Sequence, residues 1–217
     1  MATIKFIVEN PTTGALTLET LLEYPPPDFT IELFSELVAQ TRTNIVNSIV
    51  SKATRKGNVS IINGAPGAGK TTILKQIVHL SQASKADSMF VYLLKEDHQF
   101  KKLGTGSYLQ FIKKQKTPLV FIIDGIDQTI IDEHKLIFGE FSDGILNDAM
   151  SQCYFLFFGF NIDPNSFRKK QLDHAIKLEP LTIKESQRLA KIFNPKFDIN
   201  LIRTELTMAD LFAMIGV

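Results

Sequence analysis

The chain has 217 residues, which is enough for one α/β domain with a small additional part. Hydrophobic residues make up 44% and charged residues 22%, as is ordinary for a soluble globular protein. The formal net charge of +1 excludes a strong overall attraction to nucleic acid or to an anionic membrane. A single cysteine, no signal-peptide core and no apolar stretch of membrane-spanning length predict a cytoplasmic (intracellular) location.

The first 57 residues are predicted to form an N-terminal adaptor that consists of a short strand and a helix. The apolar run at residues 4–8 favours a strand, and turn-forming residues follow at 10–14. Apolar residues at helical spacing then predict one long helix or two short ones between Phe29 and Ala53. Nothing in this part of the sequence indicates its function.

The stretch Gly64–Thr71 reads G-A-P-G-A-G-K-T and fits the Walker A pattern G-x-x-x-x-G-K-[ST]. A short apolar run at 59–62 predicts a buried strand before it, and residues 72–78 have the apolar spacing of a helix after it. In that context the glycines let successive N–H groups converge on phosphate oxygens. The alternative is a glycine turn with an incidental Lys-Thr pair.

The Walker A pattern assigns a role to each residue type. Lys70 is predicted to reach the β- and γ-phosphates, and the hydroxyl of Thr71 is predicted to bind Mg²⁺. The predicted nucleotide-binding residues in this stretch are Gly64, Ala65, Pro66, Gly67, Ala68, Gly69, Lys70, Thr71 and Thr72.

Further apolar runs at 88–94, 119–123, 153–158 and 176–178 predict four more strands, separated by helical segments. Such alternation predicts a parallel sheet with helices on both faces and a ligand beyond the carboxyl ends of the strands. We therefore expect an α/β fold, namely a P-loop NTPase three-layer sandwich with the strand order 5-1-4-3-2. The expected parts are the adaptor (1–57), the P-loop NTPase core (58–180) and a C-terminal helical segment (181–217).

Two acids follow the predicted strand at 119–123. Asp124 comes directly after the apolar run, where its carboxylate can bind Mg²⁺ directly or through water, or else merely cap the next turn. Asp127 can orient the attacking water or serve the metal indirectly, and it can equally cap a helix that begins near Thr129. The predicted catalytic residues are Lys70, Asp124 and Asp127, and the predicted metal ligands are Thr71 and Asp124.

The run L-V-F-I-I-D-G-I-D-Q, which contains both acids, resembles the Walker B segment of NACHT-type NTPases of the STAND class, relatives of AAA+ proteins. The segment 176–193 is also similar to the stretch that follows the core in that class, so the resemblance covers roughly 57–193. It implies that Lys70, Thr71, Asp124 and Asp127 take the nucleotide, Mg²⁺ and hydrolytic roles. It also implies a slow ATPase that acts as a switch, ADP-bound when closed and ATP-bound when assembled.

The sequence departs from that class in three places. Gln128 stands where the class usually has Glu, so fast hydrolysis is not expected. Gly159-Phe160-Asn161 replaces a turn that commonly carries arginine, and Asn161 is either a sensor of the γ-phosphate or a simple turn residue. The chain also stops where the class continues, so we expect self-association, or a larger polypeptide or partner that supplies sensor and effector modules.

Two other functions are compatible with a Walker A loop. One is an AAA+-like ATPase that acts on nucleic-acid machinery. No feature of the sequence indicates nucleic-acid binding. If this alternative is right, DNA or RNA should stimulate ATP turnover. The other is a small-molecule kinase, which usually closes an arginine-rich lid, whereas the arginines here are few and scattered. No guanine-reading N-K-x-D motif is apparent, so ATP/ADP is the expected nucleotide.

Overall fold

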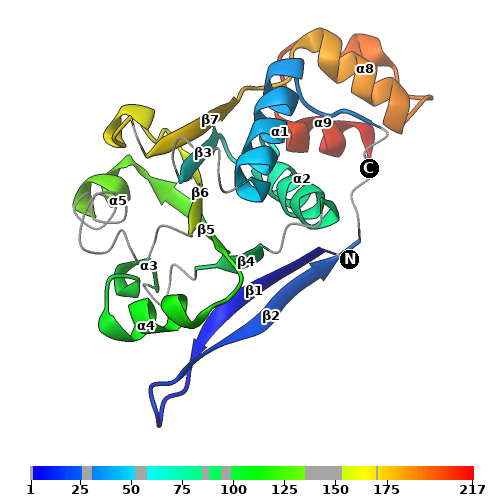
Figure 1. Ribbon diagram of the computed structural model, residues 1–217. Coiled ribbons are helices and arrows are strands. Elements are labelled where there is room, and N and C mark those ends of the chain that lie inside the picture. Colours follow the sequence, from blue (N-terminus) through cyan, green and yellow to red (C-terminus); the bar gives the residue numbers. More distant parts are fainter. Residues whose placement is uncertain are drawn as a thin grey trace.

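The computed structural model describes residues 2–25, 31–51, 58–84, 88–93, 99–134, 153–169 and 171–217. In this part of the chain, seven strands form one mostly parallel sheet with the order β2-β1-β4-β5-β6-β3-β7 (Figure 1). The strands are β1 (Ala2–Glu9), β2 (Leu16–Tyr24), β3 (Val59–Gly64), β4 (Met89–Tyr92), β5 (Leu119–Asp127), β6 (Tyr154–Phe160) and β7 (Leu172–Leu178).

The predicted strand order 5-1-4-3-2 does not match this sheet as a whole. β1 pairs in parallel with β4 and antiparallel with β2, so an N-terminal hairpin extends the sheet beyond β4. The sequence does not predict the second strand of the hairpin, because its pairing with β1 skips Leu21 and so interrupts the alternation that marks a strand. The proposed adaptor therefore contributes two strands to the same sheet as the proposed core.

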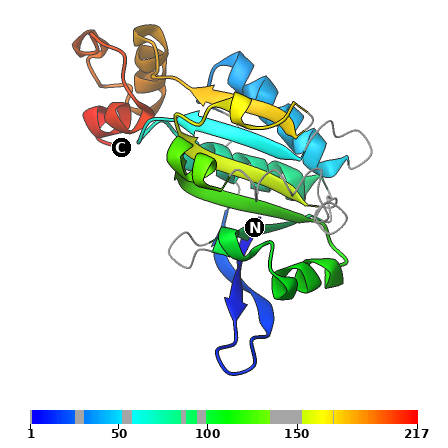
Figure 2. The same ribbon diagram turned by 90° about the vertical axis from the view of Figure 1, so that its left-hand side faces the viewer.

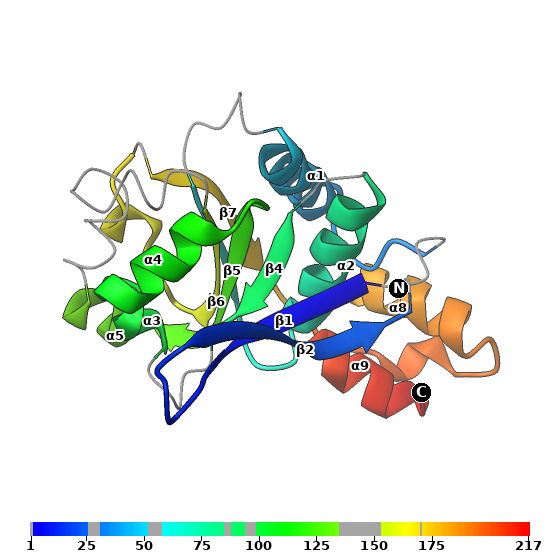
Figure 3. The same ribbon diagram turned by 60° about the horizontal axis from the view of Figure 1, so that its bottom comes forward.

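Helices cover both faces of the sheet (Figures 2 and 3). They are α1 (Glu36–Val50), α2 (Lys70–Ala83), α3 (Gln99–Lys102), α4 (Gly106–Lys114), α5 (Gln128–Glu133), α8 (Ile183–Phe193) and α9 (Met208–Ile215), with 3-10 turns η2 (Pro164–Ser166) and η3 (Ile199–Leu201). Helices α1 and α2 lie on one face, whereas α3, α4 and α5 lie on the other. Helices α8 and α9 lie together beyond the end of β7. None of the helices that the structure describes is both long and apolar enough to cross a membrane.

Helix α1 begins later than its apolar pattern predicts. Its N-cap is Ser35, whose side chain accepts the Val38 N–H, and residues 31–35 before it are not helical. Residues 26–30 and 52–57, which hold the other parts of the predicted segment, lie outside the described residues. The sequence T-I-K-E at 182–185 predicts a capping box that opens a helix through Phe193. The structure confirms it: Thr182 and Glu185 form the box that starts α8, which ends at Phe193.

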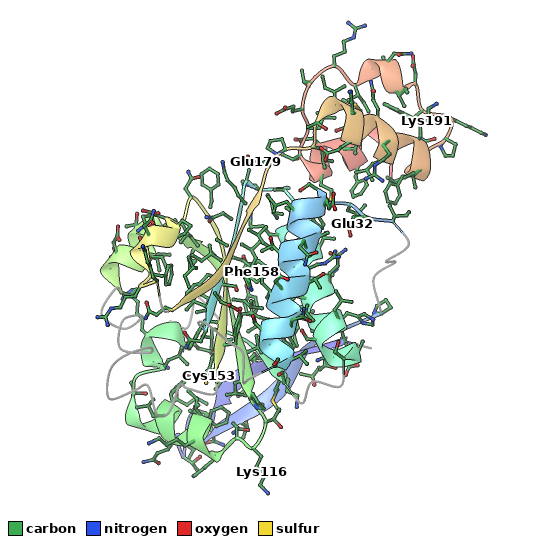
Figure 4. The ribbon with its side chains drawn as sticks, turned by 45° about the horizontal axis from the view of Figure 1, so that its top comes forward. Glu32, Lys116, Cys153, Phe158, Glu179 and Lys191 are labelled. Carbon is green, nitrogen blue, oxygen red and sulfur yellow. The ribbon has the colours of Figure 1, made fainter. Side chains whose placement is uncertain are left out.

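Two hydrophobic clusters, one on each face, hold the layers together. Successive residues of β5 alternate between them: Val120 and Ile122 pack toward α1 and α2, and Phe121 packs on the other face. Each fully buried side chain of this size contributes about 1.5–3 kcal/mol. Figure 4 shows Cys153 just before β6, Phe158 within it, and Glu179 just past β7 at the carboxyl end of the parallel strands.

Candidate functional site

The glycine loop joins the carboxyl end of β3 to the first turn of α2. Gly67 has φ = 78° and Gly69 has φ = 95°, so both lie in the left-handed region that side chains other than glycine rarely adopt. Gly69 is also the N-cap of α2, and it makes no side-chain hydrogen bond to the first N–H groups of the helix. The first N–H groups of the helix therefore remain available to an anion, and the positive end of the helix dipole favours negative charge there.

Lys70 extends back over the start of the same loop. Its Nζ donates to the carbonyl oxygens of Gly64 (2.5 Å) and Ala65 (3.0 Å), and the residue is half-buried. Thr71 is exposed in the first turn of α2, and Thr72 is partly buried beside it. The structure thus places the predicted residues 64–72 in one compact turn that carries a cation and a hydroxyl.

Asp124 lies in the same row of the sheet as the end of β3. Ile62 is paired with Phe158, and Phe158 is paired with Asp124, so Asp124 is two strands away from Ile62. At the usual strand spacing this separates their Cα atoms by about 10 Å. Row neighbours point to the same face, so the Asp124 side chain is directed to the face that α2 covers. Its Oδ1 accepts the Gly125 N–H at 2.7 Å.

A bulge then brings the second acid to the same face. Gly125 has φ = 70°, and the β5–β6 register shifts between Asp124 and Ile126. In an unbroken strand, residues three apart would point to opposite faces. Because of the bulge, Ile126 packs in the cluster away from α2, and Asp127 follows on the face of Asp124.

Asp127 also caps α5, which is the alternative role that its position allows. Its Oδ1 accepts the Ile130 N–H at 3.0 Å, and its backbone is extended, as expected of an N-cap. A hydrolytic role for Asp127 is a prediction that this contact does not test.

Replacing Asp127 with asparagine separates the two roles. Asparagine caps helices as well as aspartate does, so we expect the unfolding free energy to change by less than about 0.5 kcal/mol. If the carboxylate assists the attacking water, single-turnover ATP hydrolysis should fall by about 100-fold while nucleotide affinity stays unchanged. Rapid-quench kinetics and thermal unfolding measure both quantities. Equal hydrolysis in the two proteins would leave Asp127 as a cap alone.

Gln128 forms a bridge between two loops. Its Oε1 accepts the Asp163 N–H at 2.8 Å, and its Nε2 donates to Ser166 Oγ (2.7 Å) and Asp132 Oδ1 (2.8 Å). These bonds tie the start of α5 to the turn between β6 and β7. The carboxamide that replaces the usual acid is therefore engaged in a structural role.

Asn161 lies at the start of that turn, close to the beginning of the glycine loop. It has φ = 56°, and Asn63 fixes the next residue because Ile162 N–H donates to Asn63 Oδ1 (3.0 Å) while Asn63 Nδ2 donates to Ile162 O (2.7 Å). Asn161, Gly64 and Ala65 line the same cavity of about 560 Å³. Both the sensor role and the turn role of Asn161 remain predictions.

Residues distant in the sequence also contact the loop. The Ala209 N–H at the start of α9 donates to Gly67 O at 3.1 Å, and a side chain on Gly69 would meet Phe34 and Met208 at 3.1–3.2 Å. Phe34, Met208 and Ala68 line a second cavity of about 280 Å³. Sequence reasoning missed these residues: the pattern Thr207-x-x-Asp210 can predict where α9 begins, but not what the helix contacts.

The residues at this site suit a nucleotide with Mg²⁺. A threonine hydroxyl and an aspartate carboxylate are hard oxygen donors, and Mg²⁺ in proteins usually takes one or two such ligands with phosphate oxygens. Among the described residues, no group of three or more His, Cys, Asp or Glu side chains is placed to hold a metal ion.

Comparison with known families agrees with this geometry. Residues 36–139 match the family model Novel STAND NTPase 5. The match supports a STAND-class NTPase. It begins with α1 and includes the glycine loop, Asp124 and Asp127. A search of curated proteins found no match. At a coarse level, the STAND-class match indicates a nucleotide-binding signalling NTPase.

Proposed function

We propose that this chain is a NACHT-type switch that binds ATP and ADP, hydrolyses ATP slowly with Mg²⁺, and self-associates when ATP replaces ADP. The STAND-class match supports nucleotide binding, and the D-G-I-D pattern that ends β5 supports the NACHT subtype. In this proposal residues 58–180 form the NTPase core, residues 1–57 the adaptor and residues 181–217 the start of a helical part. Sensor and effector modules come from a longer polypeptide or from a partner.

The observation that carries the proposal is the geometry of the glycine loop. Two left-handed glycines turn the loop onto the start of α2, and Lys70 Nζ lies at the loop's first two carbonyl groups. An entering triphosphate offers the ammonium group stronger, charged acceptors than these carbonyls, because charge-assisted hydrogen bonds are about twice as strong as neutral ones.

The cavity of about 280 Å³ is the proposed site of the base. It adjoins Ala68 of the loop, and Phe34, Val38, Leu178 and Met208 give it largely apolar walls. Small-molecule sites commonly combine apolar walls with a few polar groups, and a planar base fits such a space better than a charged group does. The phosphates would extend from this cavity along the loop toward Lys70.

Hydrolysis is proposed to be slow because of the groups around Asp124. Mg²⁺ bound by Thr71 and Asp124 would neutralise phosphate charge. One carboxylate oxygen of Asp127 accepts the N-cap hydrogen bond of α5. The Gln128 carboxamide makes three hydrogen bonds and has no basic group. Neither side chain matches a free carboxylate that takes a proton from water.

Two measurements test the proposal: the identity of the nucleotide that co-purifies with the protein, and the size of the protein particle with each nucleotide. Denaturing the purified protein and separating the released small molecules should yield ADP or ATP. Light scattering should then show a larger particle with ATP and Mg²⁺ than with ADP. A protein that binds no nucleotide at micromolar concentration contradicts the binding function, and an unchanged particle size contradicts the switch.

A further inference from the structure

Residues 31–35, here called the strap, cross the glycine loop just before α1 begins. Phe34 is buried, and its ring atoms lie 3.1 and 3.2 Å from the point that a Cβ on Gly69 would occupy. The same ring is one wall of the cavity of about 280 Å³. The position of the strap therefore decides the shape of this cavity next to the loop.

Glu32 fixes the strap through two kinds of contact. Its Oε1 accepts the Phe34 N–H at 3.2 Å, so the carboxylate folds back onto the strap itself. Its Oε2 lies 3.2 Å from Arg42 Nη2, and Oε1 lies 3.5 Å from Arg42 Nη1. Figure 4 shows Glu32 between α1 and the C-terminal helices, where Arg188 of α8 donates to its backbone oxygen at 2.9 Å.

Arg42 connects the strap to the helix that begins at the glycine loop. It lies on α1 with 9% of its surface exposed, and its Nη1 donates to Gln76 Oε1 at 2.6 Å. Gln76 is a buried residue of α2, the helix that starts at Lys70. A chain of contacts thus runs from α2 through Gln76, Arg42 and Glu32 to Phe34.

The burial of Arg42 is better explained by a role in positioning its neighbours than by a gain in folding stability. Removing a guanidinium group from water is costly, and apolar residues of similar volume often stabilise a protein equally well. The planar group, however, presents donors in a fixed geometry to Gln76 and Glu32 together, which a flexible ammonium group does not reproduce. The arrangement fixes the distance between the strap and α2.

We propose that Arg42 is a positioning residue for the nucleobase. It holds Glu32, and Glu32 holds Phe34 as the wall against which the base packs. The inference rests on the proposed function, since it places the base in the cavity beside Ala68. It assigns Arg42 no contact with the phosphates, which the glycine loop binds independently.

The test compares a ligand that has a base with one that lacks it. Replacing Arg42 with methionine should weaken ATP and ADP binding by about tenfold, because the wall loses its fixed position. Binding of inorganic tripolyphosphate should change by less than about twofold, because the loop is unaltered. Isothermal titration calorimetry measures all three ligands. Arg42→Lys keeps the charge, and it should recover part of the lost ATP affinity.

Further variants separate position from folding. Glu32→Ala should likewise weaken ATP binding and leave tripolyphosphate binding unchanged, and thermal unfolding measures the cost of removing the partner carboxylate of buried Arg42. Phe34→Ala combined with Arg42→Met should bind ATP no more weakly than Phe34→Ala alone, because both act through one wall. Arg203→Met makes the same chemical change at an exposed position and should leave all three ligands unaffected.

The outcomes distinguish this inference from the proposed function. If the unaltered protein binds tripolyphosphate and ATP, but Arg42→Met weakens both equally or neither, the positioning role is wrong and the nucleotide function stands. The positioning role is also wrong if the losses of ATP affinity caused by Arg42→Met and by Phe34→Ala add fully in the double variant. If the unaltered protein binds neither ligand, the proposed function fails, and this inference fails with it.

Discussion

Replacing Lys70 with alanine is expected to weaken ATP and ADP binding by at least about 100-fold, because it removes the cation that we propose binds the phosphates. The lysine Nζ lies at the start of the glycine loop, within hydrogen-bonding distance of the Gly64 and Ala65 carbonyls. The main-chain N–H groups of the loop would remain, but they carry only partial charges. Fluorescence or calorimetric titration with both nucleotides measures the loss.

A lysine five residues further along the same helix provides the control. Lys75 is exposed on α2, so Lys75→Ala makes the same charge change outside the loop and should bind nucleotide normally. Lys70→Ala should stay folded and unfold only a few degrees below the unaltered protein, since its two partly buried hydrogen bonds contribute about 1 kcal/mol each. Unchanged ATP affinity in a folded Lys70→Ala protein would show that the loop is not the phosphate site.

The elements that the sequence predicts best are those encoded by neighbouring residues. The run before Asp124 predicts β5 because five apolar residues in succession suit a strand that is buried on both faces. The box formed by Thr182 and Glu185 predicts the start of α8 because both partners lie within one turn. Gly67 and Gly69 predict a tight loop because few other residues adopt their backbone angles.

Features that depend on contacts between distant residues were not predictable in this way. The bulge at Gly125 puts both acids on one face, yet D-G-I-D in an ideal strand would place them on opposite faces. Residues 16–24 form a strand because β1 pairs with them, although their own apolar pattern is irregular. Phe34 lies before the N-cap Ser35, because α1 begins at Glu36, later than the apolar spacing suggests.

Gln128 shows what a single residue in the sequence does not reveal. It stands where the class that this chain resembles usually has an acid, and slow hydrolysis stays a prediction from that difference. The structure adds that the carboxamide joins α5 to η2 through Ser166 and to the turn through Asp163. The bonds span 35 and 38 residues of sequence, so no local pattern encodes them. The same holds for Arg42 and Gln76, which are 34 residues apart.

Replacing Asp124 with asparagine should abolish most of the dependence of ATP affinity on Mg²⁺. Asparagine has nearly the same shape, and its Oδ1 can still accept the Gly125 N–H, so the bulge and the fold should persist. The neutral amide, however, is a much weaker partner for a hard divalent cation than a carboxylate is. We therefore expect the gain in ATP affinity on adding Mg²⁺ to fall by about tenfold or more, whereas ADP binding without Mg²⁺ should be unaltered.

Asp132→Asn is the matched control, because Asp132 is an exposed acid on neighbouring α5 whose oxygen accepts the Gln128 amide, a bond that asparagine can keep. It removes the same charge from the region and should retain the full response to Mg²⁺. Titrations of ATP with Mg²⁺ and with a chelator measure that response in all three proteins. If Asp124→Asn responds to Mg²⁺ as strongly as Asp132→Asn does, Asp124 merely holds the Gly125 turn. The metal must then be sought at another oxygen ligand, of which Asp127 at the end of the same strand is the next to test.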